Sequence, residues 1–294
     1  TKLKLLIKNM KEKKSDIFYG KFADKFLNFS NGVEFLYYAF TFNMYNNDNK
    51  QAIYALENNK IIPTFKDYML RVKNFYKYSL KKIQNHYLFI GDSHLLNYEY
   101  LFLNKFYKKF LVFFCRIQGS SSYGLKKKNS KSGAIKTVEK IFRFNHKNPK
   151  IFLNFGEVDC RSTLWLVKKK RNKKIDVILK QAILNYKDLV LTIKKRGYSE
   201  IILIGVIEPL WKENNIWTKK SASYIEVKKI TKQYNKELKN ISKELGCDYF
   251  DINDEIKKLL KKNQNVSVIK GEHHLNPQKI SKILYRKIYK YNLN

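Results

Sequence analysis

The sequence predicts an α/β fold, and three observations lead to this prediction. From about residue 86 onward, short apolar runs alternate with longer amphipathic segments. The apolar runs are continuous, which is typical of parallel strands that are buried on both faces. The longer segments repeat their apolar residues at helical spacing. Together these patterns predict a doubly wound parallel sheet with helices on both of its faces.

Five strands and five helices are expected in this region. The strands fall at 87–90, 110–115, 151–155, 201–207 and 249–252, and the helices fall at about 95–108, 132–145, 173–196, 221–245 and 277–291. This number of elements corresponds to a flavodoxin-like three-layer sandwich with a five-stranded parallel sheet. In 173–196 the apolar residues form one stripe that includes Ile178, Leu184 and Leu189, so this face is expected in the core.

The first 85 residues have a different pattern. They are rich in aromatic residues, Asn and Lys, and their apolar residues recur at helical spacing, as in Tyr68, Val72 and Phe75. We therefore expect residues 1–85 to form a helical N-terminal appendage or the tail of a preceding domain. Residues 86–294 are expected to form the α/β domain.

The composition excludes some classes of protein and leaves the partner open. The 294 residues include 60 Lys and Arg against 25 Asp and Glu, which gives a net charge of +35, and 44% of the residues are hydrophobic. This apolar content excludes wholesale disorder, and no uncharged apolar run approaches the roughly 18 residues of a membrane span. The charge would suit a polyanion, but the basic residues are spread along the chain and no nucleic-acid recognition motif is present, so a nucleic-acid partner is not favoured. The dense basic run 168–174 is interpreted as a loop leading into a helix.

The cysteines bear on compartment and cofactors. Cys115, Cys160 and Cys247 are too few and too scattered for a disulfide framework, and no Cys/His spacing indicates zinc. A reducing, cytoplasmic location is the simpler interpretation, with association with a membrane surface as an alternative. No metal or cofactor is expected, and the oligomeric state stays open.

Glycines and polar residues that could take part in binding or catalysis follow the predicted strands. Gly91-Asp92-Ser93-His94 follows the first strand, Gly119 follows the second, Gly156-Glu157-Val158-Asp159-Cys160-Arg161 follows the third, and Gly271-Glu272-His273-His274 precedes the last helix. Ligands of open parallel sheets bind outside the carboxyl ends of the strands. The sequence therefore predicts a site at this edge.

A serine nucleophile needs a base, and an imidazole is the usual one. Ser93 is the candidate nucleophile and His274, or else His273, the candidate base. Glu272 is either a solvent-facing surface residue or the acid that orients the imidazole. The backbone amides of Ser93 and Gly119 could hold an oxyanion. A simpler interpretation of Ser93 is a helix N-cap.

The remaining polar residues of this edge have two interpretations each. His94 is interpreted first as a packed side chain and alternatively as a substrate contact. Glu157 and Asp159 are either acids at a helix start or, with Arg161, part of a substrate-binding cluster. Asp92 and Gly156 are also candidates for substrate binding.

These motifs resemble the sequence blocks of the SGNH (GDSL-type) hydrolase superfamily. Gly91-Asp92-Ser93 resembles the first block, Gly119 stands where the family has the glycine of its second block, Gly156 to Asp159 resembles the third block, and Gly271 to His274 resembles the fifth. The blocks occur in the family's order over residues 86–291. Two positions depart from the pattern, since Val158 replaces the family's oxyanion Asn and Gly271 replaces its Asp.

The resemblance implies a serine-dependent esterase or O-acyltransferase. Because relatives commonly modify carbohydrates, it implies an O-acylated carbohydrate substrate and a divergent member linked to polysaccharide modification. The two departures support an alternative, in which the SGNH-like fold serves non-hydrolytic group transfer, glycosyl or similar, in the biosynthesis of surface polysaccharides.

Overall fold

The computed structural model describes residues 86–95, 97–98, 111–117, 119–127, 130, 132–142, 149–210, 222–262, 266 and 275–289. The expected appendage 1–85 lies outside these ranges. So does the expected helix 95–108, apart from residues 95, 97 and 98.

The predicted five-stranded parallel sheet is confirmed. Its strands are β1 (His86–Gly91), β2 (Leu111–Arg116), β3 (Lys150–Asn154), β4 (Ile201–Ile204) and β5 (Asp248–Phe250), and all neighbouring strands are parallel. Their order across the sheet is β2-β1-β3-β4-β5, the flavodoxin-like order. β4 is shorter than the predicted 201–207, because the chain leaves the strand after Ile204. The order reverses direction between β1 and β3, which is where ligands bind in folds of this kind.

Four predicted helices are confirmed and two others were missed. The confirmed helices are α7 (Ala134–Ile141), α9 (Ile175–Lys195), α10 (Tyr224–Glu244) and α12 (Pro277–Tyr289). The missed helices are α8 (Leu164–Arg171) and α11 (Asn253–Lys261).

The interpretation of the basic run 168–174 as a loop leading into a helix is wrong for its first half. Lys168 to Arg171 end α8, and Asn172 then stops the helix with a left-handed backbone (φ 48°). The physical reason is that Lys and Arg are good helix formers, and the first turn of α8 is anchored by the buried side chains of Leu164 and Trp165.

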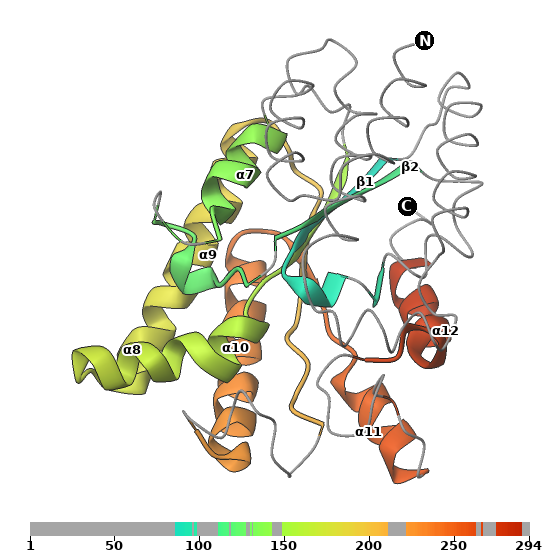
Figure 1. Ribbon diagram of the computed structural model, residues 1–294. Coiled ribbons are helices and arrows are strands. Elements are labelled where there is room, and N and C mark those ends of the chain that lie inside the picture. Colours follow the sequence, from blue (N-terminus) through green and yellow to red (C-terminus); the bar gives the residue numbers. More distant parts are fainter. Residues whose placement is uncertain are drawn as a thin grey trace, which may run out of the picture.

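Helices cover both faces of the sheet (Figure 1): α7, α8, α9 and α10 lie on one face, and α11 and α12 lie on the other. The strand residues alternate between the two layers. Leu88 and Ile90 belong to the core under α9 and α10, whereas Tyr87 and Phe89 belong to the core under α11 and α12. Phe89 stacks on Phe152 of β3 with ring centroids 4.3 Å apart.

The stripe predicted on 173–196 faces the core with one exception. Ile178 and Leu189 are buried, but Leu184 is 42% exposed and its neighbour Asn185 is buried instead. Of the helices that the structure describes, none has the length and apolarity to cross a membrane.

Candidate functional site

The candidate site is built where β1, flanked by β2 and β3, reaches its carboxyl end. The amide of Asp92 donates to the carbonyl of Asn154 (2.9 Å), and the amide of Ile117 donates to the carbonyl of Gly91 (2.7 Å). These bonds continue the strand pairing by one residue on each side of β1. As a result, the loops that follow β1, β2 and β3 start side by side.

Gly91 is required by this close approach. A Cβ atom at this position would lie 2.1 Å from the carbonyl oxygen of Asn154, which is a backbone atom and cannot move aside. The glycine therefore allows β1 and β3 to remain paired up to the residue that precedes Asp92-Ser93.

Ser93 begins a short 3-10 helix (Ser93–Leu95) at the end of β1 and is half-buried. The amide of His94 donates to the Asp92 carboxylate (3.0 Å), which fixes the turn that presents Ser93. Asp92 itself is fully buried, and burial raises the pKa of its carboxyl group to about 6. Its second oxygen, Oδ2, has no hydrogen-bond partner among the described residues.

A buried charged cluster lies beside this turn. Glu157 forms an ion pair with Arg161 four residues later, and the Nε2 atom of His94 lies 3.6 Å from a Glu157 carboxylate oxygen. All three residues are less than a tenth exposed. The structure thus brings His94, Glu157 and Arg161 together from the β1 and β3 loops, as a packed group of polar side chains at the predicted edge.

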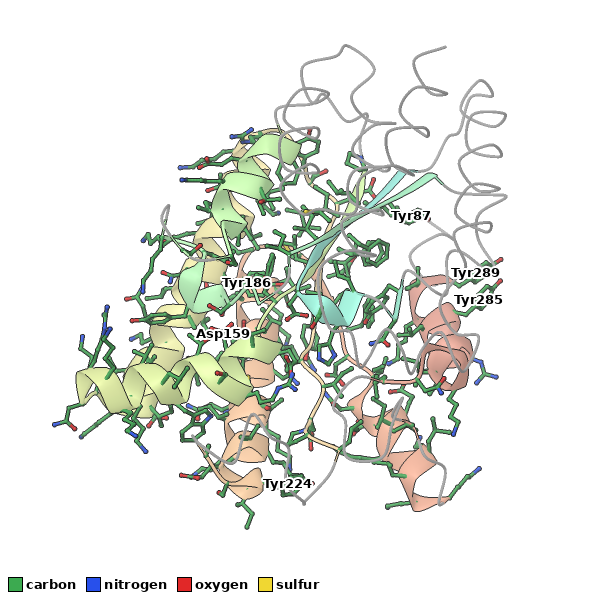
Figure 2. All side chains as sticks on the ribbon, in the orientation of Figure 1. Tyr87, Asp159, Tyr186, Tyr224, Tyr285 and Tyr289 are labelled. Atoms are coloured by element: carbon green, nitrogen blue, oxygen red, sulfur yellow. The ribbon has the colours of Figure 1, made fainter. Side chains whose placement is uncertain are left out.

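Asp159 holds the loop that follows β2. It begins a single π-helical turn (Asp159–Thr163), and turns of this kind often occur at functional sites. Its carboxylate accepts hydrogen bonds from the amide and hydroxyl of Ser122 (2.5 and 2.9 Å) and from the amide of Tyr123 (3.0 Å). Burial raises the pKa of Asp159 to about 6, although these hydrogen bonds lower it. The side chain lies in the layer between the sheet and α8 (Figure 2).

Two further side chains hold the same turn at Tyr123. Asn185 of α9 donates to its carbonyl (2.9 Å), and Arg171 at the end of α8 donates to its hydroxyl (3.3 Å). Just upstream, Gly119 is exposed and has φ +63°, a conformation that L side chains rarely adopt. The turn at residues 122–123, which follows Gly119, is therefore held by the π-helical turn, α8 and α9.

The position of the third-block asparagine of the SGNH pattern holds Val158, which precedes the π-helical turn and is partly buried. Its side chain offers no hydrogen-bond donor. Gly156 has φ +122°, and a Cβ atom there would lie 2.4 Å from the ring of Tyr234, so this glycine serves packing against α10.

The candidate base lies outside the described residues, together with Gly271, Glu272 and His273. The residues directly after His274 are described. Leu275 is fully buried in the core cluster that also contains Leu95, and the amide of Asn276 donates to the carbonyl of Val266 (2.7 Å). The chain segments next to His274 and next to Ser93 thus share one core cluster.

The sequence analysis missed several residues that shape this edge. Ser122 and Asn185 hold the Gly119 loop, and Asn235 of α10 binds both backbone groups of Val206 after β4 (2.7 Å each). The signal that could have found the two asparagines is a buried polar residue on an otherwise apolar helical stripe, because such a residue needs a hydrogen-bond partner.

Comparison with known proteins gives matches among solved structures only. No family model matches the chain, and no curated protein matches it in sequence. Among solved structures, the chain is similar to the acetyl xylan esterase AlAXEase (TM-score 0.45, 15% identity, 70% of this chain and 98% of that chain).

Two other solved structures give similar values. One is an acetylxylan esterase from Geobacillus stearothermophilus (TM-score 0.46, 17% identity, 70% of this chain and 94% of that chain), and the other is an α/β hydrolase from the metagenome of Lake Arreo, Spain (TM-score 0.46, 14% identity, 69% of this chain and 94% of that chain). With TM-scores below 0.5, these similarities carry no weight for function, and the fold assignment rests on the strand order of the chain itself.

Proposed function

We propose that this protein is a serine-dependent esterase or O-acyltransferase of the SGNH type that acts on an O-acylated carbohydrate. Ser93 is the nucleophile and His274 the general base, with His273 as the alternative and Glu272 as the acid that orients the imidazole. The single observation that carries the proposal is the position of Ser93. It stands at the carboxyl end of β1, beside the reversal of strand order, on a turn fixed by Asp92 and next to an anchored glycine loop.

The chemistry follows from this arrangement. The imidazole takes the proton of the Ser93 hydroxyl as its oxygen attacks the ester carbonyl, and the amides of Ser93 and Gly119 hold the oxyanion. The ester oxygen leaves with the proton from the imidazolium. The acyl group on Ser93 then passes to water or to a sugar hydroxyl, and the same base activates that acceptor.

Removal of the hydroxyl tests the proposal. Ser93→Ala is expected to lower the rate of acetate release from p-nitrophenyl acetate by at least about a thousandfold, because removing a triad nucleophile costs a factor of this order or more. Ser199→Ala is the matched control, since Ser199 is exposed and lies before β4, at the opposite end of the strands. Equal rates for wild type and Ser93→Ala would refute the nucleophile.

One observation favours a second candidate, which is non-hydrolytic group transfer. Val158 offers no donor at the position of the SGNH oxyanion asparagine. Under this alternative, Ser93 would resist labelling by a fluorophosphonate, and a nucleotide sugar would raise the melting temperature. Labelling of Ser93 without stabilisation by the nucleotide sugar would favour the esterase.

A further inference from the structure

The structure contains a strongly basic surface that the proposed chemistry does not use. We call residues 168–174 the basic segment. It contains Lys168, Lys169, Lys170, Arg171, Lys173 and Lys174, interrupted only by Asn172, and every one of its residues is exposed. It ends α8, which projects from the domain (Figure 1).

Some of these basic residues interact with other parts of the protein itself. Cations are favoured in the last turn of a helix by the helix dipole. The ammonium group of Lys168 lies over the ring of Trp165 (5.5 Å to the centroid), and Arg171 donates to Tyr123. No acidic side chain in the described ranges pairs with Lys169, Lys170, Lys173 or Lys174. These four charges are available to an external partner.

Exposed aliphatic side chains precede and follow the basic segment in the chain, and another lies at the start of α10. The three most exposed large hydrophobic residues in the part of the chain that the structure describes are Ile225 (75%), Leu166 (56%) and Val177 (53%). Leu166 and Val177 flank the basic segment on its two sides. Ile225 is at the start of α10. Hydrogen bonds from Ser223 lower the pKa of the adjacent Glu226, and the charge of Lys168 lowers it further. α10 also contacts the π-helical turn from which α8 continues, so the start of α8 lies near α10. Tyr224 marks this start of α10 in Figure 2.

The combination of charge and apolar exposure discriminates between partners. A polyanion such as RNA requires positive charge but gains little from exposed aliphatic side chains. A membrane surface with anionic lipids uses both, because lysines are attracted to the headgroups while apolar side chains enter the boundary with the acyl chains.

We propose that the basic segment, Leu166, Val177 and the start of α10 bind the surface of a membrane that contains anionic lipids. α8 is about 12 Å long at 1.5 Å per residue and begins three residues after Arg161. Binding through this surface would therefore hold the candidate site close to the membrane. The proposal does not depend on the chemistry at Ser93.

Co-sedimentation of the full chain with lipid vesicles tests the proposed membrane binding. The vesicles are phosphatidylcholine alone or phosphatidylcholine mixed with phosphatidylglycerol. The test variant is K169Q/K170Q/K173Q, and the control is K195Q/K239Q/K243Q, which removes the same charge from exposed lysines at the far ends of α9 and α10. A third variant, L166S/I225S, keeps every charge. Circular dichroism melting verifies that each variant folds.

The wild type is expected to bind only the vesicles with phosphatidylglycerol. Since each lysine near an anionic surface contributes about fivefold in binding, the test variant should bind roughly a hundredfold more weakly, and the control should stay within a few-fold of wild type. L166S/I225S should also bind more weakly. Equal losses in the two triple variants, or unchanged binding of L166S/I225S, would overturn the proposal. Binding of RNA but not of vesicles would overturn it in favour of a nucleic-acid partner.

Discussion

At the scale of single residues, two buried aspartates at this edge of the sheet each fix a different turn. Asp92 fixes the turn that presents Ser93, and Asp159 fixes the turn that follows Gly119. Both carboxylates are fully buried and act on backbone amides. The glycines and Ser93 could be placed at this edge from the sequence, because they directly follow predicted strands. The partners of Asp159 could not, since Ser122 is 37 residues away in the chain.

Asp159→Asn tests the role of Asp159 as a positioning residue. An amide group replaces one acceptor oxygen with a donor, so one hydrogen bond from the 122–123 turn is lost. If Gly119 contributes to an oxyanion hole, kcat should fall about tenfold to a hundredfold with little change in KM, because small misplacements of catalytic groups have effects of this size. Steady-state kinetics on p-nitrophenyl acetate gives both constants.

A second measurement separates positioning from general loss of stability. In nuclear magnetic resonance spectra, the amide proton of Ser122 should be strongly downfield in the wild type and should move upfield in Asp159→Asn. Wild-type kcat in Asp159→Asn, while Ser93→Ala is inactive, would refute the positioning role and leave the nucleophile intact.

At the scale of elements, long periodic segments were predictable and short ones were not. α9 and α10 each have 21 residues with an apolar stripe, whereas α8 has eight residues and ends in consecutive basic residues. Its stability depends on tertiary contacts, such as the hydrogen bond from Trp165 Nε1 to the carbonyl of Cys160 (2.8 Å). Such contacts have no local signature in the sequence.

The start of α10 offers a test at this scale. Ser223 and Glu226 form a capping box, in which each side chain binds the backbone amide of the other. Ser223→Ala removes one half of it and should lower the free energy of unfolding by about 1 kcal/mol. Urea denaturation measures this value. A change below about 0.3 kcal/mol would show that solvent replaces the cap.

At the scale of the whole molecule, the strand order follows from rules of topology applied to the predicted elements. Whether residue 274 lies near residue 93 does not follow from local patterns, because it depends on how the final loop returns to the first strand. Ser93 could therefore be placed at this edge from the sequence, whereas its pairing with His274 stays a prediction.

The pH dependence of stability also belongs to this scale. Folded pKa values of about 6 for Asp92 and Asp159 exceed the ordinary value of 3.8, so the folded state holds more protons than the unfolded state between these limits. Stability contributed by these groups is therefore lost as the pH rises from about 4 to about 6 and stays constant above that range.

Asp92→Asn isolates one of the two groups and preserves the acceptor for the His94 amide. Urea denaturation over this pH range should show a smaller loss of unfolding free energy in the variant than in wild type. Identical pH profiles would contradict a raised pKa for Asp92.

The position of β5 at the edge of the sheet has a consequence for biosynthesis. Among the strands that the structure describes, β5 pairs only with β4, and it begins 44 residues after the end of that strand. While a ribosome is still translating this interval, β4 has a free hydrogen-bonding edge, which is a template for aggregation between nascent chains. Release of a chain truncated before Asp248 would make that transient exposure permanent.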